Sequence, residues 1–315
     1  MKTDRIFFNT HKPLTFKFQQ NRYDFIVDEV PSKKLTNRGN YFVLQIKKEH
    51  LSTWDLLKTI SKKLGIDEHQ IGYAGLKDKN ATTTQYISIP LNKSRDYKKL
   101  NSKNIQVLKT FKHHEKLKIG NLSGNRFKIT LKDIKAEELP LIYQTLSQIQ
   151  KNGMPNYFGY QRFGKEYNFE QAKQIIYGDE VVTDKKVAKF LKLAYQSYFF
   201  NAWLAKRIEL SYEMGFKKIQ PLEGDIYSRE NKKIITGLLP GRNIIRAKDK
   251  ARAIEEQFDD IYIHEKGFRR DAVVIPKDIK NRYIEEKGWL ELEFTLPKSS
   301  YATVLVENLA NKNFG

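Results

Sequence analysis

The stretch Trp289-Leu290-Glu291-Leu292-Glu293-Phe294-Thr295-Leu296 determines the fold prediction for this chain. Apolar and polar residues alternate along it with a period of two, which predicts a β-strand with one buried face. Phe127-Lys128-Ile129-Thr130-Leu131, in the first half of the chain, alternates in the same way. A strand of this kind near the end of the chain indicates a core that a middle segment interrupts and the tail completes.

The first half of the chain mixes strand and helix patterns. Two helices are predicted, one over 54–64 that begins at Ser52 or Thr53 and ends at Gly65, and one over 137–151. Runs of β-branched and aromatic residues predict strands at 25–27, 41–46, 86–89 and 105–108. This mixture predicts an α+β fold with a mainly antiparallel sheet.

The second half has a different pattern. Its longest helical stretch covers 186–213 and ends near Gly215. A more polar, turn-punctuated segment that includes 236–241 follows, and a short helix is predicted around 302–310. At 315 residues the chain exceeds one ordinary domain, so we expect two compact units or one core with a large insertion.

Composition narrows the class of protein. Hydrophobic residues make up 40% of the chain and aromatic residues 12%, which supports a sizeable core and excludes wholesale disorder. The chain has no cysteine, which excludes disulfides, a thiol nucleophile and cysteine-ligated metal sites. No apolar run approaches the roughly 18 residues of a membrane span, and no signal peptide is recognised. We therefore expect a soluble, cytoplasmic protein.

The net charge of +20 is unevenly distributed. Residues 1–152 carry 29 Lys and Arg against 14 Asp and Glu, whereas residues 153–315 carry 28 against 23. A basic face favours a polyanionic partner, because bound cations release counterions from phosphates. A lysine-rich chain can also reflect genome base composition, but the asymmetry favours an anion-binding face.

The strongest local feature is Gly72-Tyr73-Ala74-Gly75-Leu76-Lys77-Asp78-Lys79-Asn80-Ala81-Thr82-Thr83-Thr84-Gln85. Its glycines allow a tight turn, and the lysines beside Asp78 would keep that carboxylate ionised and nucleophilic. Taken by itself, such a triplet is more often a solvated surface loop. The glycine spacing does not match a Walker loop.

Two further motifs combine aromatic and polar residues. In Gly124-Asn125-Arg126-Phe127, the asparagine is suited to a base edge or a ribose and the phenylalanine to base stacking; the alternative is a β-hairpin with Phe127 in the core. Pro155-Asn156-Tyr157-Phe158-Gly159-Tyr160-Gln161-Arg162-Phe163-Gly164 is either a stacking platform or, for most of its residues, core packing. His113 and His114 are adjacent and would face opposite sides of a strand, which makes them a poor metal pair.

Together these motifs resemble the TruD family of pseudouridine synthases. The family's AG-x-KDK-x-A-x-T-x-Q signature is similar to residues 74–85, and its PNYFG-x-QRFG signature is similar to residues 155–164. Shorter signatures match in family order at 24–27, 124–127, 200–201, 237–241 and 296–303. The resemblance therefore covers nearly the whole chain.

The resemblance implies a pseudouridine synthase fold that carries an inserted TruD-specific α/β domain. On this basis we expect the first part of the catalytic domain at 1–153, the insertion at 154–288 and the completing segment at 289–315. The implied activity is isomerisation of uridine to pseudouridine at position 13 in the D arm of tRNA, without a cofactor or metal. The expected partner is tRNA and not a membrane, and the expected state is a monomer.

The resemblance also implies site residues. Asp78 matches the catalytic aspartate, a nucleophile that acts on a flipped-out base, with attack on the sugar or on the ring left open. Phe25, Asn125 and Tyr301 match substrate-contacting positions, Phe127 matches a pocket aromatic, and Tyr301 stands where some members have Phe. Candidate phosphate contacts are Lys77, Lys79, Lys109, Lys112 and Lys116.

One position departs from the family pattern. Some members have a lysine shortly before the 24–27 signature, and Gln19 occupies that position here. Lys17 and Arg22 are the nearby substitutes, so the cationic partner of Asp78 is left open. Two other functions remain as alternatives: a non-catalytic RNA-binding or RNA-folding protein, which the intact Asp78 motif disfavours, and a metal-dependent nuclease, which the scattered acidic residues disfavour.

Overall fold

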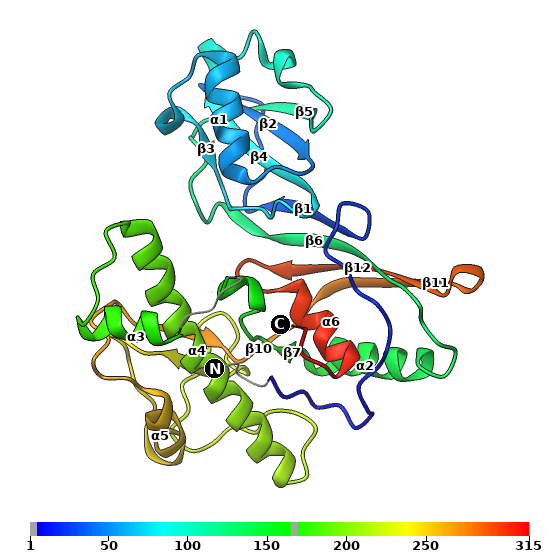
Figure 1. The fold of residues 1–315 in the computed structure, drawn as a ribbon, viewed down its shortest axis with the longest axis vertical. Coiled ribbons are helices and arrows are strands. Elements are labelled where there is room, and N and C mark those ends of the chain that lie inside the picture. Colours follow the sequence, from blue (N-terminus) through cyan, green and yellow to red (C-terminus); the bar gives the residue numbers. More distant parts are fainter. Residues whose placement is uncertain (1–4, 165–168, 315) are drawn as a thin grey trace. The chain divides into compact units, whose positions relative to one another are not determined.

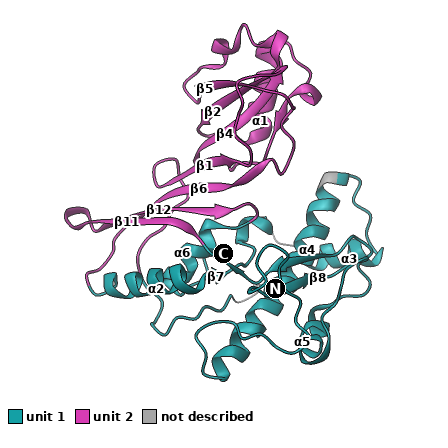
Figure 2. Cartoon of the chain, turned by 180° about the vertical axis from the view of Figure 1, so that it is seen from behind, with its two compact units in different colours: residues 1–14, 137–275, 300–315 teal, residues 15–136, 276–299 magenta. Residues whose placement is uncertain are grey.

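The structure of the protein, a computed structural model, describes residues 5–164 and 169–314. The chain forms two compact units (Figure 2). We call residues 15–136 and 276–299 the sheet unit, and residues 1–14, 137–275 and 300–315 the helix-rich unit. None of the helices within the described ranges is long and apolar enough to span a membrane.

An eight-stranded sheet fills the sheet unit (Figure 1). Its strand order is β11-β12-β6-β1-β4-β2-β5, with β3 paired to β4. β1 and β4 run parallel and the other pairs are antiparallel, so the predicted α+β class with a mainly antiparallel sheet is confirmed. The strands are β1 (Phe25–Pro31), β2 (Tyr41–Lys48), β3 (Gly72–Tyr73), β4 (Thr82–Pro90), β5 (Ile105–His113), β6 (Leu122–Leu131), β11 (Lys277–Ile284) and β12 (Trp289–Pro297).

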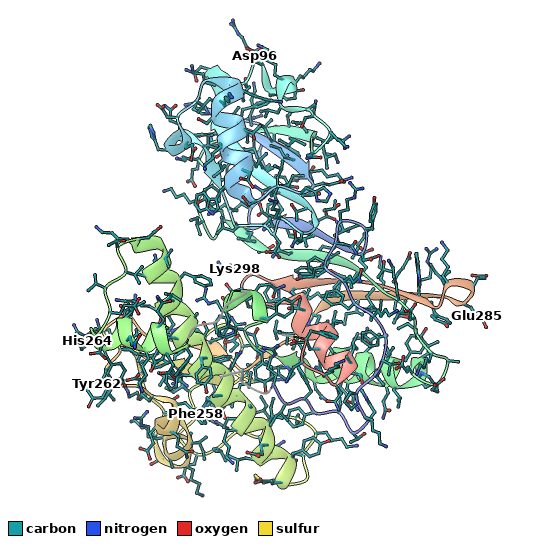
Figure 3. The ribbon with its side chains drawn as sticks, viewed as in Figure 1. Asp96, Phe258, Tyr262, His264, Glu285 and Lys298 are labelled. Carbon is teal, nitrogen blue, oxygen red and sulfur yellow. The ribbon has the colours of Figure 1, made fainter. Side chains whose placement is uncertain are left out.

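β12 lies beside β6, far earlier in the sequence. Phe294 pairs with Phe127 and Leu292 with Ile129, so the two stretches with matching alternation form one ladder. The alternate residues of β12 are buried, as the pattern predicts. β11 and β12 form a hairpin that turns at the short 3₁₀ helix η6 (Glu285–Lys287), where Glu285 lies at the tip (Figure 3).

The two units have different bounds from the domains predicted from the sequence. A boundary between 288 and 289 would separate β11 from β12, which pair along most of their length. A boundary between 153 and 154 falls within the helix-rich unit. β11 was not predicted because its largely charged and polar sequence, KDIKNRYI, lacks a clear alternation. The assignment of a catalytic and an inserted domain stays a prediction.

Helix α1 (Thr53–Leu64) packs on one face of the sheet. Ser52 and Asp55 form a capping box at its start, and Gly65 ends it in the left-handed conformation at φ 59°. Leu56, Leu57 and Ile60 pack against apolar residues of β2 and β4. The predicted helix is confirmed, but Trp54, expected on the apolar side, is 44% exposed because it lies off the buried stripe.

The helix-rich unit is built around α4 (Lys185–Glu213), in which Phe200, Trp203 and Ile208 reach a buried core. Its other helices are α2 (Leu139–Asn152), α3 (Phe169–Tyr177), α5 (Asp249–Glu255) and α6 (Ala302–Ala310). Its strands are β7 (Met154–Pro155), β8 (Thr236–Leu239), β9 (Phe268–Asp271) and β10 (Val273–Val274). The remaining 3₁₀ helices of the chain are η1 (Glu68–Gln70), η2 (Leu91–Lys93), η3 (Tyr97–Leu100), η4 (Tyr160–Arg162) and η5 (Glu256–Phe258). The helices predicted at 137–151, 186–213 and 302–310 are confirmed as α2, α4 and α6.

The prediction of a turn over 236–241 was wrong for its first four residues. They form strand β8, which pairs with β9. A Cβ on Gly237 would lie 2.3 Å from the Trp203 ring, so this glycine allows close packing and does not make a turn. The chain turns only afterwards, at Gly241, where φ is +155°.

Candidate active site

One face of the sheet collects most of the predicted site residues. Across β1 and β6, Val27 pairs with Phe127 and Glu29 with Asn125. Val27 also pairs with Thr83 of β4, and Thr83 pairs with Lys48 of β2. Because directly paired residues project to the same side of a sheet, these side chains share a face. It is the face that α1 covers, and we call it the α1 face.

The loop that carries Asp78 is anchored over the α1 face. The backbone N–H of Lys77 donates to Thr53 Oγ1 at 2.8 Å, and Thr53 donates in turn to Gln85 Oε1 at 3.1 Å. Lys48 Nζ donates to the backbone oxygen of Asp78 at 3.1 Å. The start of α1, β4 and β2 therefore hold the backbone, while the Asp78 side chain stays exposed. This is more than the solvated surface loop that the triplet alone suggests.

Two buried lysines set the charge around Asp78. Desolvation by the surrounding protein raises the pKa of the Asp78 carboxyl, and the charges of Lys48 and Lys77 oppose that rise. Lys48 is only 1% exposed, and burial lowers its pKa to about 8 despite the attraction of Asp78. The charges of Asp78 and Lys48 therefore each favour the charged form of the other and oppose the effect of desolvation on both.

Lys77 is not exposed, as a phosphate contact would require. It is buried, and its Nζ lies 2.9 Å from Glu29 Oε2, whose side chain is also buried. Glu29 further accepts from the backbone N–H of Tyr86. Lys77 is therefore committed to an internal ion pair, and we do not retain it as a phosphate contact.

Buried polar atoms without a protein partner gather on the α1 face. Thr83 Oγ1, Gln85 Nε2 and Asn125 Oδ1 are all buried and make no hydrogen bond with the residues that the structure describes. Leaving such a group unsatisfied costs about 1–3 kcal/mol, so several on one face indicate a site for a polar ligand or water. Asn125, predicted as a substrate contact, is one of the three.

The predicted aromatic residues Phe25 and Phe127 lie in an aromatic row on the same face. The Phe25 ring centroid lies 5.9 Å from Phe18 and 6.0 Å from Phe127, and Phe127 stacks on Phe294 at 5.6 Å. Phe25 is 2% and Phe127 6% exposed. Phe127 thus enters the core, as the alternative interpretation holds, but from within strand β6 and not from a hairpin turn.

The close approach of two strands explains why the 124–127 motif begins with a glycine. A Cβ there would lie 2.1 Å from the backbone oxygen of Leu296 on β12. The glycine therefore allows β6 and β12 to approach closely beside Asn125, and it does not mark a turn.

Tyr301 belongs to the helix-rich unit. It is the residue before α6, and its ring lies 6.0 Å from that of Phe158 in an edge-on arrangement. A Cβ on Gly159 would lie 3.0 Å from Tyr301 Cδ1, so the 155–164 motif packs directly on the start of α6. Residues 156–159 are buried, which fits the core-packing interpretation for that part of the motif.

The remaining lysines are not brought together. Lys79 is exposed in the Asp78 loop, and Lys109 and Lys112 are exposed on β5. Lys109 pairs with Gln45 and Lys112 with Phe42, residues that point to opposite faces of β2. Lys109 lines a hollow of about 600 Å³ on the face opposite α1. Lys116 Nζ donates to the backbone oxygen of His69.

Sequence reasoning missed Lys48, whose charge acts most on Asp78. Lys17 instead pairs with Asp133 at 2.7 Å, and Arg22 lies 3.8 Å from Glu49. A signal for Lys48 exists: it follows Leu44 and Ile46 at a spacing of two, so the strand alternation points its side chain into the core. Burial of a lysine at a core position costs free energy, so its presence there indicates a function. Glu29, Thr53 and Gln85 were also missed.

A metal site is not formed by the described residues, which contain no group of three or more His, Asp or Glu suited to hold an ion.

Comparison with known proteins gives a consistent result. The family model described as tRNA pseudouridine synthase D (TruD) matches residues 4–183. The chain is 37% identical to the tRNA pseudouridine synthase D of a Nitratiruptor species and 36% identical to that of Wolinella succinogenes, with 98% of both chains covered in each case.

A solved structure shares the fold. A Methanosarcina mazei protein assigned to tRNA pseudouridine synthase D superposes with a TM-score of 0.73 at 24% identity, over 99% of this chain and 97% of that one. The resemblance noted in the sequence motifs is thus confirmed along the whole length. The chain belongs to the TruD family of tRNA pseudouridine synthases.

Proposed function

We propose that this chain converts uridine 13 in the D arm of tRNA to pseudouridine, with Asp78 as the nucleophile. Family membership supports the reaction and the class of RNA. The observation that carries the proposal is the α1 face itself. It combines the exposed carboxylate of Asp78, a buried lysine that donates to the Asp78 backbone, and three buried polar atoms that have no hydrogen-bond partner among the described residues.

The reaction is an isomerisation and needs no external reactant. The bond between ribose C1′ and N1 breaks, a bond between C1′ and C5 forms, N1 gains a proton and C5 loses one. A carboxylate can act by adding to C1′ as the uracil leaves or by adding to the ring, and either route requires the ionised form. Lys48 and Lys77 favour that form by lowering the pKa of Asp78 against the effect of desolvation.

Asn125 supplies the recognition of uracil in this proposal. Its buried Oδ1 accepts no hydrogen bond from the described residues, and uracil N3–H is a donor that can satisfy it. Cytosine has no hydrogen at N3, so the same oxygen would face an acceptor. The amide would therefore favour uracil over cytosine once the base is flipped out.

We assign Phe25 and Phe127 to the aromatic wall of the site. Phe25 packs against Phe18 and Phe127 and is 2% exposed, so its ring is open to a base only if a neighbour such as Phe18 moves. In this proposal the aromatic wall limits how closely the flipped-out uracil approaches the α1 face. The stacking role implied by the family resemblance then depends on displacement of Phe18 when RNA binds.

The test uses unmodified tRNA transcripts and the full chain in the presence of EDTA. Pseudouridine is located by chemical labelling and primer extension, with a transcript that has cytidine at position 13 as the matched control. We expect product at position 13 of the normal transcript and none in the control. Intact, unmodified RNA would favour a non-catalytic RNA-binding protein, cleaved RNA would favour a nuclease, and product elsewhere would overturn the assigned position.

A further inference from the structure

Two arginines of the helix-rich unit lie against the same aromatic ring. The Cζ atom of Arg270 is 4.0 Å from the centroid of Phe158, and that of Arg162 is 5.3 Å from it. Arg162 comes from the 155–164 motif and Arg270 from β9, more than a hundred residues later. Both are partly buried and partly open to solvent.

Neither arginine has a carboxylate within ion-pair distance among the described residues. Every other arginine of this unit that is not exposed does have one. These pairs are Arg5–Glu307, Arg207–Asp225, Arg246–Asp259, Arg252–Asp259 and Arg269–Glu255. Arg269, the direct neighbour of Arg270, thus has an acidic partner and Arg270 has none. The positive charge beside Phe158 is uncompensated within the described ranges.

Neutral hydrogen bonds hold the two guanidinium groups in place. Arg270 donates from Nε to Asn156 O at 2.8 Å and from Nη2 to Asn156 Oδ1 at 2.7 Å. Arg162 donates from Nε to Ser197 Oγ at 3.0 Å. Nη1 of Arg270 and both terminal nitrogens of Arg162 donate no hydrogen bond to the described residues, so they are available to a ligand. Fixed guanidinium planes with free N–H groups are suited to bind an anion in a fork geometry.

The electrostatics of the two arginines favour binding of an anion. Desolvation lowers the pKa of both groups, and together with the smaller effect of the Arg162 charge it lowers that of Arg270 to about 10. The Tyr301 phenol opposes the shift at both arginines, so it lies near both. Asp271 acts on Arg270 only weakly and hydrogen-bonds towards Ser228. Two like charges held together at partly desolvated positions are costly unless a ligand neutralises them.

The start of α6 adds to the positive field. Tyr301 is the residue that precedes this nine-residue helix, and its side chain does not cap the free N–H groups of the first turn. A helix N-terminus attracts negative charge through its dipole and these N–H groups. Gly159 packs directly against Tyr301 and Thr303, which keeps the arginine motif at this helix end.

We propose that Arg162 and Arg270 bind one phosphate of the tRNA backbone, next to the nucleotide that Tyr301 contacts. The inference rests on the proposed function, because tRNA is the polyanion that the enzyme must hold. Phe158 supports both guanidinium groups from behind, and Asn156 and Ser197 set their orientation. The two guanidinium groups are held in place before RNA binds, so the site would fix the position of the RNA strand as well as add affinity.

The first test compares single charge removals. Arg162→Gln and Arg270→Gln should each weaken tRNA binding about 10- to 100-fold, because charge-assisted hydrogen bonds to phosphate are lost. The slope of log K against log salt should fall in magnitude by about 0.7–0.9, as expected for one lost phosphate contact. Lys217→Gln removes the same charge from an exposed position of this unit and should change affinity by less than about twofold. Thermal unfolding of each variant checks the fold.

The second test keeps the wild-type protein and changes the RNA. Short D-arm RNAs, each with one methylphosphonate linkage, neutralise one phosphate at a time. One linkage should weaken binding to wild-type protein about 10-fold or more, and the same linkage should cost Arg162→Gln little further. This arm does not depend on Arg270→Gln folding well. Arg162→Lys should recover only part of the loss, since it restores the charge without the fork.

The outcomes separate this inference from the proposed function. Folded Arg162→Gln and Arg270→Gln proteins that bind tRNA with wild-type affinity and salt slope would overturn the phosphate site, while wild-type protein still makes pseudouridine. An identical methylphosphonate profile for wild-type protein and Arg162→Gln would overturn it as well. A wild-type protein that makes no pseudouridine would instead refute the proposed function.

Discussion

The Asp78 loop and the 155–164 motif use buried positive charge in opposite ways. Around Asp78, the buried Lys77 is paired with Glu29, and Lys48 donates to the backbone oxygen of Asp78 while its charge lowers the pKa of the Asp78 carboxyl. Around Phe158, Arg162 and Arg270 have no carboxylate at ion-pair distance within the described residues. In the proposed function, the first region prepares a reactive carboxylate and the second binds an anion of the substrate.

Removal of the reactive carboxylate tests the first half of this comparison most strongly. Asp78→Asn should lower the rate of pseudouridine formation by about a thousandfold or more, the scale of removing a catalytic nucleophile. Affinity for tRNA should stay within a few-fold, because the phosphate contacts lie on cationic side chains elsewhere. Single-turnover rates and filter-binding measurements on the same preparation check both. If affinity falls along with the rate, Asp78 acts in holding the site together and not as the nucleophile.

Lys48 tests whether the buried cation acts through Asp78. Its charge lowers the pKa of Asp78, so Lys48→Met should raise that pKa and move the acid limb of the pH–rate profile to higher pH. The rate near neutral pH should fall, because less of the Asp78 carboxyl is then ionised. Lys47→Met, a change at a half-exposed neighbour on the opposite face, is the matched control and should leave the profile in place.

Stability gives an independent readout of Lys48. Its pKa is lowered from 10.5 to about 8 in the folded protein, so the unfolded chain binds more protons between these values. The free energy of unfolding should therefore gain a rising contribution from about pH 8 to about pH 10.5. Lys48→Met should lose this contribution and Lys47→Met should keep it. Equal pH dependence in all three proteins would mean that Lys48 is not desolvated as the structure indicates.

Sequence predicted those features of the fold that depend on local pattern. The alternation of β12, the capping box of α1 and the length of α4 are written in neighbouring residues. β11 escaped because an edge strand with largely polar residues has no clear alternation, and β8 was misread because Gly237 serves contact with Trp203. Strand alternation indicates that Lys48 enters the core, but its contact with the Asp78 loop arises only through tertiary packing and could not be predicted.

A substitution at Phe25 tests whether this residue is part of the core on the α1 face or contacts the substrate base. Phe25→Leu keeps a large apolar side chain but removes three buried carbon atoms, so it should cost about 1–3 kcal/mol of stability. If the base stacks on this ring, the change removes about 1–3 kcal/mol, and the rate should fall about 5- to 160-fold. The loss should be smaller on an RNA whose uridine is already unstacked. Activity and melting temperature measured together decide the matter, since an unchanged rate in a folded variant assigns Phe25 to the core.

The smallest expected effects come from the exposed lysines of β5, which test which face of the sheet binds RNA. Lys109 and Lys112 project to opposite faces, so they serve as controls for each other. If tRNA contacts the α1 face, Lys112→Glu should reduce the magnitude of the salt slope by about 0.7–0.9 and weaken binding a few-fold, whereas Lys109→Glu should change little. The reverse pattern would assign RNA contact to the hollow that Lys109, Tyr86 and Arg126 line on the other face. Equal, negligible effects would leave both lysines as solvated surface residues, and the excess charge of the first half would then have no role in binding at this strand.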